Sequence, residues 1–367
     1  MQKACAMRNT MIKKILICTQ TFPPKIGGME AVMHSLAQHF SSRGIKTLVA
    51  CDKPYSQRED FEILYCKAPK LIRSNIKRLM LIRESFQPNL TICDSWKSVC
   101  SVPNNSGPIV VLAHGQEYLK SKEKRAAIKR ALSKAKLVVC SSKMTKALVD
   151  SFDCPVTSIV IYPTYMLGNS DRCHEPNIDQ EKPVNIASIC RLDERKGLLT
   201  SAKALRALLD VGFEFNWTIA GAGPQESELR DYIDESDISS CTRIIGKINE
   251  GEKANLLQRT DLFLMPSYQV GNSLEGFGIS YIEAASYGIP AIAGIAGGAP
   301  EAVLNGETGW CVDGSDERVI KAALKDALTD SGQRERFGQV ARERFNREFE
   351  GNVVFTQLLR ALENTLS

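Results

Sequence analysis

Short apolar runs alternate with amphipathic helical patterns along the whole chain. The helical pattern is clearest where apolar side chains recur three and four residues apart from Met29 to Phe40 and Gly44 supplies a stop. Such alternation is typical of βαβ units with parallel sheets. We predict strands at these apolar runs: 12–19, 46–51, 61–66, 89–93, 109–113, 137–141, 158–162, 184–190, 215–220, 242–248, 260–265, 289–293 and 309–312.

The pattern is long enough for two domains, because 367 residues exceed what one hydrophobic core usually serves. A polar stretch with several prolines, from Thr164 to Lys182, interrupts the alternation and is predicted to be the linker. We therefore predict an α/β protein of two doubly wound Rossmann-like domains facing a cleft. They are expected at residues 1–170 and 171–345, with a last helix at 346–367 that returns to the first domain.

No segment of the sequence predicts a membrane span. The longest apolar stretch, YGIPAIAGIAGGAP, is broken by glycine and proline and is too short to cross a bilayer. Near the start, Arg8, Lys13 and Lys14 divide the apolar residues, which argues against a signal peptide. We expect residues 1–11 to be a frayed leader and the protein to be cytoplasmic.

The cysteines predict neither disulfides nor a metal site. Most of the 12 lie inside apolar, strand-like runs and no two form a C-x-x-C pair. The four histidines are not clustered either. We expect buried thiols in a reducing compartment and no bound metal.

Charge is divided unevenly between the two halves. Residues 1–170 carry 26 Lys and Arg against 11 Asp and Glu, a net +15, whereas residues 171–367 carry 21 against 31, a net −10. So basic a first half favours an anionic partner, which could be a membrane surface, a nucleic acid or an acidic substrate.

The turns between strand and helix are the candidate sites, because open α/β sheets bind ligands at the carboxyl ends of their strands. The first turn, TFPPKIGGME, offers Gly27 and Gly28, whose bare amides can approach a phosphate, although such a pair is more often only a turn. His114 ends the run VVLAH, where a lone histidine is more often structural. No G-x-G-x-x-G occurs here or in AGAGP at 220–224, which weakens a nicotinamide or flavin site.

A turn in the second half, ICRLDERKG, sets Arg191 and Lys196 five residues apart. A planar guanidinium and a mobile ammonium suit two adjacent phosphates. The alternative is an ordinary solvated loop, since two acidic residues lie between them.

The stretch SLEGFGISYIEAASYG holds two glutamates. Glu275 lies in a glycine-rich turn, and Glu283 lies eight residues on, roughly 12 Å along a helix that we expect to begin near Gly278. The helix N-terminus between them attracts anions, and carboxylates accept hydrogen bonds from hydroxyls. This spacing suits a ligand with hydroxyl groups on both sides of a diphosphate.

These turns together resemble a known family. FPPKIGGME, AHGQE, CRLDERKG, IAGAGP, IIGKI, LMPSY, EGFGISYIEAASYGIPAIAG and GWCVDG occur in the order seen in the retaining glycosyltransferases of family 4, which have the GT-B fold. The resemblance covers nearly the whole chain. It is particularly similar to the phosphatidylinositol mannoside mannosyltransferases and related envelope-glycan enzymes.

The resemblance implies that the second domain holds a nucleotide-diphosphate sugar. Arg191 and Lys196 would stabilise the leaving diphosphate, and Glu283 would hold the ribose hydroxyls. Glu275 would contact the donor sugar. Beside it would lie the amides of four further residues: Gly276, Phe277, Gly278 and Ile279.

The resemblance also assigns roles elsewhere. Ile248 would line the base pocket through its backbone, Gly27 and Gly28 would border the diphosphate, and His114 would contact the sugar near its reacting face. The catalytic set would then be His114 with the two cations and Glu275. Cys190 stands where family members often have glycine, and YPTYM replaces Asn-Gly-x-Asp at the end of the first domain.

The implied reaction is a front-face transfer in which the leaving phosphate helps to deprotonate the acceptor hydroxyl. No carboxylate is clearly placed as a nucleophile, and no Asp-x-Asp motif is present, so we expect the cations to replace a metal and no cofactor to be needed. GDP-mannose is the first donor expected, with UDP-sugars next. The acceptor would be lipid-linked or a saccharide, in envelope polysaccharide or lipopolysaccharide synthesis.

Two other functions stay open. A non-hydrolysing sugar-nucleotide epimerase shares the broad fold, but the glutamate pair argues against it. A non-catalytic protein that binds an anionic polymer would use the basic half; no recognisable nucleic-acid module appears, so we expect no nucleic-acid partner.

Two basic stretches in the first half suggest where the anionic partner binds. Residues 67–86 interleave six cations with apolar residues and one acid, and residues 120–136 hold eight cations and one acid. The plain interpretation is that apolar residues pack inward and cations are solvated. Two such stretches favour docking on anionic lipid, at the inner face of the membrane, through cations that include Arg73, Lys77 and Arg78.

Overall fold

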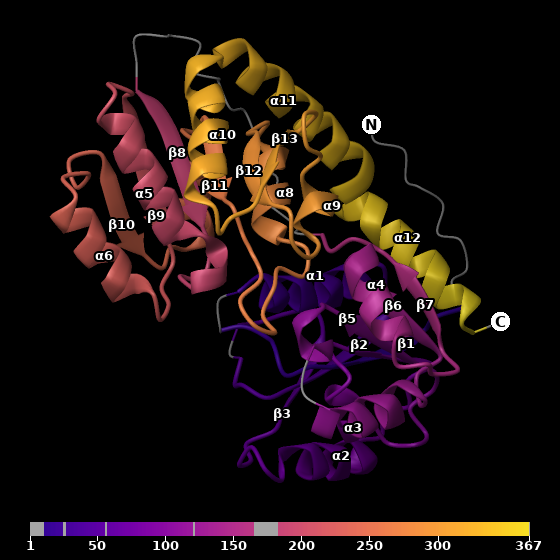
Figure 1. Ribbon diagram of the computed structural model, residues 1–367. Coiled ribbons are helices and arrows are strands. Elements are labelled where there is room, and N and C mark those ends of the chain that lie inside the picture. Colours follow the sequence, from indigo (N-terminus) through magenta and orange to yellow (C-terminus); the bar gives the residue numbers. More distant parts are fainter. Residues whose placement is uncertain (1–10, 25–26, 56, 120–121, 165–182, 367) are drawn as a thin grey trace. The chain divides into compact units, whose positions relative to one another are not determined.

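A computed structural model describes residues 11–366, apart from 25–26, 56, 120–121 and 165–182 (Figure 1). The chain divides into two compact units. Unit 1 comprises Met1–Met166 with Gly351–Ser367, and unit 2 comprises Leu167–Glu350. The predicted linker and the predicted frayed leader lie largely outside the described residues.

Unit 1 is built on a seven-stranded sheet in the order β3-β2-β1-β4-β5-β6-β7, with every described pair parallel. Its strands are β1 (Lys14–Cys18), β2 (Lys46–Cys51), β3 (Glu62–Tyr65), β4 (Leu90–Cys93), β5 (Ile109–Ala113), β6 (Leu137–Cys140) and β7 (Thr157–Val160). Its α-helices are α1 (Gly28–Ser42), α2 (Arg73–Arg83), α3 (Lys122–Leu132), α4 (Lys143–Asp150) and α12 (Gly351–Asn364). The central strands are buried on both faces, which explains their unbroken apolar runs.

The last helix, α12, belongs to unit 1 because it packs against α1. The Phe355 ring lies 4.5 Å from the ring of His39 and 5.0 Å from that of Phe40, measured between centroids. The guanidinium of Arg43 lies over the same ring at 4.4 Å. These contacts bring the C-terminal segment back to the first helix of the chain.

Unit 2 is built on a six-stranded parallel sheet in the order β10-β9-β8-β11-β12-β13. Its strands are β8 (Val184–Ile189), β9 (Phe215–Ala220), β10 (Thr242–Gly246), β11 (Leu262–Met265), β12 (Ala291–Gly294) and β13 (Gly309–Val312). Its α-helices are α5 (Leu198–Leu209), α6 (Glu226–Glu235), α7 (Glu250–Leu257), α8 (Ile279–Ser286), α9 (Ala299–Ala302), α10 (Glu317–Thr329) and α11 (Ser331–Arg344). Trp217 anchors the core, its indole N–H donating to the Ser188 hydroxyl at 2.9 Å.

Every apolar run predicted as a strand forms one, so the prediction of two Rossmann-like domains is confirmed. In each sheet the strand order reverses beside the first strand, between β1 and β4 in unit 1 and between β8 and β11 in unit 2. A reversal of this kind separates the neighbouring loops at the carboxyl edge and leaves a crevice for ligands.

The cysteine prediction needs one correction. Cys190 and Cys311 are partly exposed rather than buried, because one follows the end of β8 and the other lies on the edge strand β13. The cysteines of the described residues are free thiols. Within the same residues, no helix combines the length and the apolar character needed to cross a bilayer.

Candidate functional site

The strand reversal in unit 2 brings together two of the predicted turns. Gly197, after the turn that follows β8, has a φ of 72°, and a β-carbon there would lie 2.3 Å from the Pro266 carbonyl oxygen. Only glycine permits both this conformation and this approach. The turn holding Lys196 therefore packs directly on the segment after β11 that leads to Glu275.

A buried charge cluster links these turns. The Glu275 carboxylate accepts from the Arg195 guanidinium at 3.0 Å and pairs with the Lys196 ammonium. Its side chain is only 12% exposed. Burial by itself would raise the pKa of Glu275, but the two cations outweigh burial and hold that pKa below its ordinary value. The cluster thus carries one net positive charge.

Arg191 lies apart from this cluster. Its guanidinium is 70% exposed and pairs with Asp193 at 3.2 Å. The sequence paired Arg191 with Lys196, whereas the structure places Arg195 with Lys196 on Glu275. Spacing alone does not say which cation of an irregular loop turns inward, so no sequence pattern singled out Arg195.

The predicted helix start after Gly278 is confirmed, since α8 begins at Ile279. Gly278 has a φ of 92°, and a β-carbon there would lie 2.4 Å from the Tyr281 ring. Phe277 is buried and meets the Phe349 ring edge-on at 5.7 Å. Gly276, by contrast, supplies a carbonyl that a β-carbon on Gly298 would approach to 2.1 Å. The four residues from Gly276 to Ile279 form a rigid turn whose helix end carries partial positive charge.

Glu283, on α8, is also buried and already paired. Its carboxylate accepts from the Lys253 ammonium at 2.8 Å, and Lys253 also pairs with Glu250 at 3.0 Å. Burial would lower the pKa of Lys253, but the two glutamates raise it above its ordinary value. No sequence motif singled out Lys253, which reaches Glu283 from the separate helix α7.

Ile248 is half-buried and lies between the end of β10 and the Asn249 cap of α7. Strand β10 ends at Gly246, two residues earlier than predicted. Ile248 therefore sits in the loop at the carboxyl edge of the sheet, on the same edge as the two turns with the charge cluster.

In unit 1, the predicted residues follow β1 and β5. Gly28 opens α1, Gly27 caps it, and both are exposed. His114 follows β5 and is half-buried, with its Nε2 3.1 Å from the Asp94 carbonyl oxygen. Asp94 follows β4 at the strand reversal and is buried. No sequence pattern singles out Asp94, because its contacts depend on β4 lying beside β1.

Unit 2 thus presents, along one sheet edge, a cation-rich cluster, a helix N-terminus and a buried carboxylate. Cations and helix amides stabilise phosphate charge, and a fixed carboxylate accepts from hydroxyl groups. Such a set can bind a nucleoside diphosphate.

Both halves of the chain match models of known protein families. The family model "Glycosyl transferases group 1" matches residues 170–344, and the model "Glycosyltransferase Family 4" matches residues 26–164. Structures of similar fold include sucrose-phosphate synthase from Thermosynechococcus elongatus, with 18% identity, 95% of this chain and 98% of that chain covered, and a TM-score of 0.79. HepE of Anabaena in complex with UDP has 17% identity, 96% and 100% coverage, and a TM-score of 0.79.

Curated relatives point the same way. The amylovoran biosynthesis glycosyltransferase AmsK of Erwinia amylovora is 26% identical over 70% of this chain and 64% of its own length. A GDP-mannose-dependent alpha-(1-6)-phosphatidylinositol monomannoside mannosyltransferase of Mycolicibacterium smegmatis is 26% identical over 86% and 89%. The match to AmsK spans less than two thirds of that protein. With both family models matched and the GT-B fold present, the chain belongs to the family 4 glycosyltransferases.

Proposed function

We propose that this protein transfers a hexose, mannose being the first expectation, from a nucleoside diphosphate sugar to a lipid-linked or saccharide acceptor in cell-envelope glycan synthesis. The observation that carries this proposal is the cluster of Lys196, Arg195 and Glu275 beside the N-terminus of α8. Relatives that act on envelope glycans support the acceptor class.

The proposed chemistry uses fixed charge. As the bond between sugar and phosphate loosens, negative charge builds on the departing diphosphate, so cations held beside it stabilise the transition state more than the ground state. Glu275 holds Lys196 and Arg195 in place through its ion pairs. We propose transfer with retention by the front-face route, with the leaving phosphate as base.

The proposal also covers the donor nucleotide and the need for a metal. GDP-mannose is favoured because relatives are named GDP-mannose-dependent, while HepE was crystallised with UDP. We propose that the side-chain cations serve in place of a metal.

A transfer assay tests the proposal. The purified chain is incubated with sugar nucleotides and with an acceptor lipid or saccharide extract, and the labelled product is analysed for linkage by NMR. We expect transfer with retained anomeric configuration. Conversion of the sugar nucleotide without any acceptor would instead indicate an epimerase, and no conversion of any donor would contradict the proposal.

The two basic stretches of unit 1 differ in the structure. On α3, Ile128 and Leu132 are buried and the described cations are mostly exposed, as in an ordinary surface helix. On α2, Leu81 is buried, but other apolar residues face outward. Leu79 is 52% and Ile82 57% exposed, and Leu71 just before the helix is 97% exposed. An apolar face of this kind on a helix is typical of an interaction surface.

Two cations assigned to the lipid surface turn inward. Lys77 is 2% exposed and pairs with Asp52, and Arg73 pairs with Asp52 at 3.2 Å. The expectation that Lys77 meets lipid headgroups is therefore wrong, because its charge is buried inside the fold. Arg73 and Arg78 are half-buried, and Arg78 donates to the Asn104 side chain at 3.3 Å. We propose that exposed Lys70, before α2, and Arg83, in its last turn, meet the headgroups instead.

We propose that the outer face of α2 contacts anionic membrane, its apolar residues entering the headgroup region and its flanking cations attracting lipid. Vesicle co-sedimentation tests this. Leu79→Ser with Ile82→Ser should weaken binding to anionic vesicles about tenfold or more. The matched control, Val319→Ser with Val340→Ser, removes two exposed apolar residues of unit 2 and should leave it unchanged. Equal loss in both pairs would contradict the assignment to α2.

A further inference from the structure

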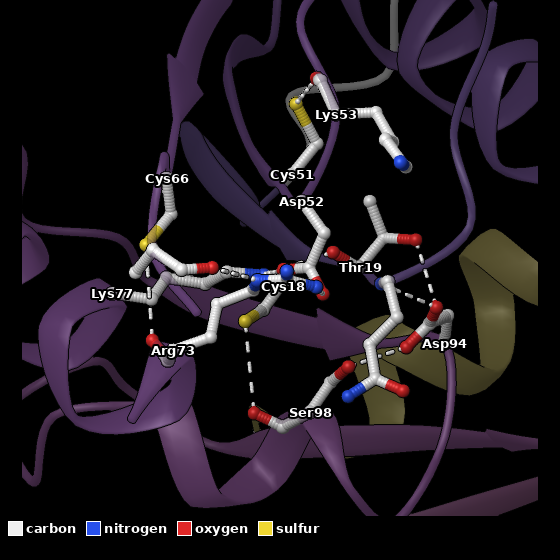
Figure 2. Close-up of polar contacts among 12 residues, drawn as sticks. Cys18, Thr19, Cys51, Asp52, Lys53, Cys66, Arg73, Lys77, Asp94 and Ser98 are labelled. Atoms are coloured by element: carbon white, nitrogen blue, oxygen red, sulfur yellow. Dashed lines mark hydrogen bonds and ion pairs between the residues drawn. The ribbon is translucent and has the colours of Figure 1, made fainter. Parts of the chain in front are cut away.

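The carboxylate of Asp94 is 3% exposed and lies where the strand order of unit 1 reverses. Its Oδ2 accepts from four donors of the segment after β1. These are the Thr19 hydroxyl at 2.8 Å, the Gln20 amide at 2.7 Å, and the Thr21 amide and hydroxyl at 3.1 and 2.9 Å. Its Oδ1 accepts from the Ser98 hydroxyl at 2.5 Å. Figure 2 shows Thr19 and Ser98 each turned toward a different oxygen of the Asp94 carboxylate.

The same segment is held from its carbonyl side as well. The buried Lys77 ammonium donates to the Thr19 carbonyl oxygen at 3.0 Å and is itself paired with Asp52 (Figure 2). Two buried charged groups thus fix the segment after β1: Asp94 accepts from its amides, and Lys77 donates to its carbonyl. An ordinary turn is held by its own backbone, so this degree of anchoring needs another explanation.

Asp94 also holds His114. The Asp94 carbonyl oxygen can only accept, so the Nε2 of His114, 3.1 Å away, carries the proton. In the neutral ring Nδ1 is then an acceptor, and the ring orientation is fixed. The His114 amide donates to the Glu117 carboxylate at 2.7 Å, which fixes the backbone next to it.

We propose that Asp94 is a positioning residue that sets two parts of the unit 1 sheet edge together: its side chain fixes the segment after β1, and its backbone fixes His114 as an acceptor for a ligand hydroxyl. This inference rests on the proposed function for the identity of the ligand. The anchoring of the segment itself does not.

The test compares the two oxygens of one carboxylate. Asp94→Ala removes both carboxylate oxygens, whereas Ser98→Ala removes one donor to Oδ1, the oxygen that does not hold the β1 segment. Asp94→Asn serves as the conservative variant, because its amide oxygen can replace Oδ2 while its NH₂ faces the Ser98 hydroxyl, which can accept. Should Asp94→Ala not fold, Thr21→Val removes one hydroxyl donor and carries the same test.

Two readouts are used. Amide hydrogen exchange of the peptide covering residues 19–22 should accelerate in Asp94→Ala and stay near wild type in Ser98→Ala. In the transfer assay, kcat of Asp94→Ala should fall about 100-fold through misplacement of reacting groups. Asp94→Asn should recover most of it.

Equal exchange in wild type and Asp94→Ala would overturn the inference, as would a kcat loss in Ser98→Ala as large as in Asp94→Ala. A chain that transfers no sugar would contradict the proposed function, while the exchange readout would still decide whether Asp94 anchors the segment.

Discussion

Each unit has a buried carboxylate on the segment that follows the strand where its sheet order reverses, β4 in unit 1 and β11 in unit 2. The two carboxylates differ in the groups that surround them. In unit 1, Asp94 is surrounded by hydroxyl and amide donors. In unit 2, Glu275 is surrounded by Arg195 and Lys196. Neutral donors fix a segment in place, whereas cations also leave positive charge at the edge of the sheet.

This difference suggests a division of labour. Unit 1 uses its carboxylate to hold backbone, and its exposed cations lie elsewhere, on surfaces such as α3. Unit 2 has an overall acidic composition but concentrates cations where its strand order reverses. The proposal that unit 2 binds the diphosphate therefore rests on where its cations lie and not on its net charge.

The largest effect is expected from removing the unit 2 cation. Lys196→Ala should lower kcat by about 10²- to 10³-fold, because its charge matters most as the diphosphate departs. Steady-state kinetics with the best donor measures this. Lys203→Ala, an exposed lysine on α5, is the control and should behave like wild type. A kcat of Lys196→Ala near wild type would show that the cluster does not stabilise the leaving group.

The second effect is on stability. Lys253→Met leaves Glu283 buried without its cation, so the free energy of unfolding should fall by about 3–5 kcal/mol in urea denaturation. Glu250→Gln removes the exposed partner of Lys253 and should change it by less than about 0.5 kcal/mol. If the free energy of unfolding fell by the same amount in both variants, the buried pair would not be the dominant contact.

A separate kinetic effect is expected at Glu283. Glu283→Ala should raise the donor KM more than it lowers kcat.

A smaller effect should depend on pH. The pKa of Glu275 is held below its ordinary value, so its ion pairs stabilise the fold above that value and are lost as pH falls through the lowered pKa. At pH 7 the free energy of unfolding of the wild type should exceed that of Glu275→Gln by about 2 kcal/mol. The gap should narrow in acid, because a protonated glutamic acid resembles glutamine. A gap that stays constant between pH 7 and 3 would contradict the charge assignment.

The smallest effect is expected from a chelator. If side-chain cations do the work of a metal in unit 2, turnover in excess EDTA should match the untreated enzyme. Loss of activity in EDTA with recovery in Mg²⁺ or Mn²⁺ would show that the cluster is insufficient by itself.

The sequence predicted the strands well because buried parallel strands appear as unbroken apolar runs. It predicted the turn before α8, since Gly278 has no substitute in its left-handed conformation. It did not predict that Arg195 pairs with Glu275, because the residues of an irregular loop have no periodicity. It also placed Lys77 on the surface, since an amphipathic pattern does not say which face of α2 turns inward.

The sequence pattern did not predict contacts between residues far apart in the chain. Lys253 and Glu283 come from different helices, and Asp94 meets Thr19 only because β4 lies beside β1. Strand order follows from packing of the whole unit, and the local pattern does not contain it.

Titration of nucleoside diphosphates tests the central claim most directly, because binding to the folded state raises the unfolding temperature by mass action. With GDP, UDP and ADP as probes, we predict that one raises the unfolding temperature of the wild type strongly, and that Glu283→Ala and Lys196→Ala each weaken this response. If no nucleoside diphosphate raised the unfolding temperature, or if both variants responded like wild type, unit 2 would not be the donor site.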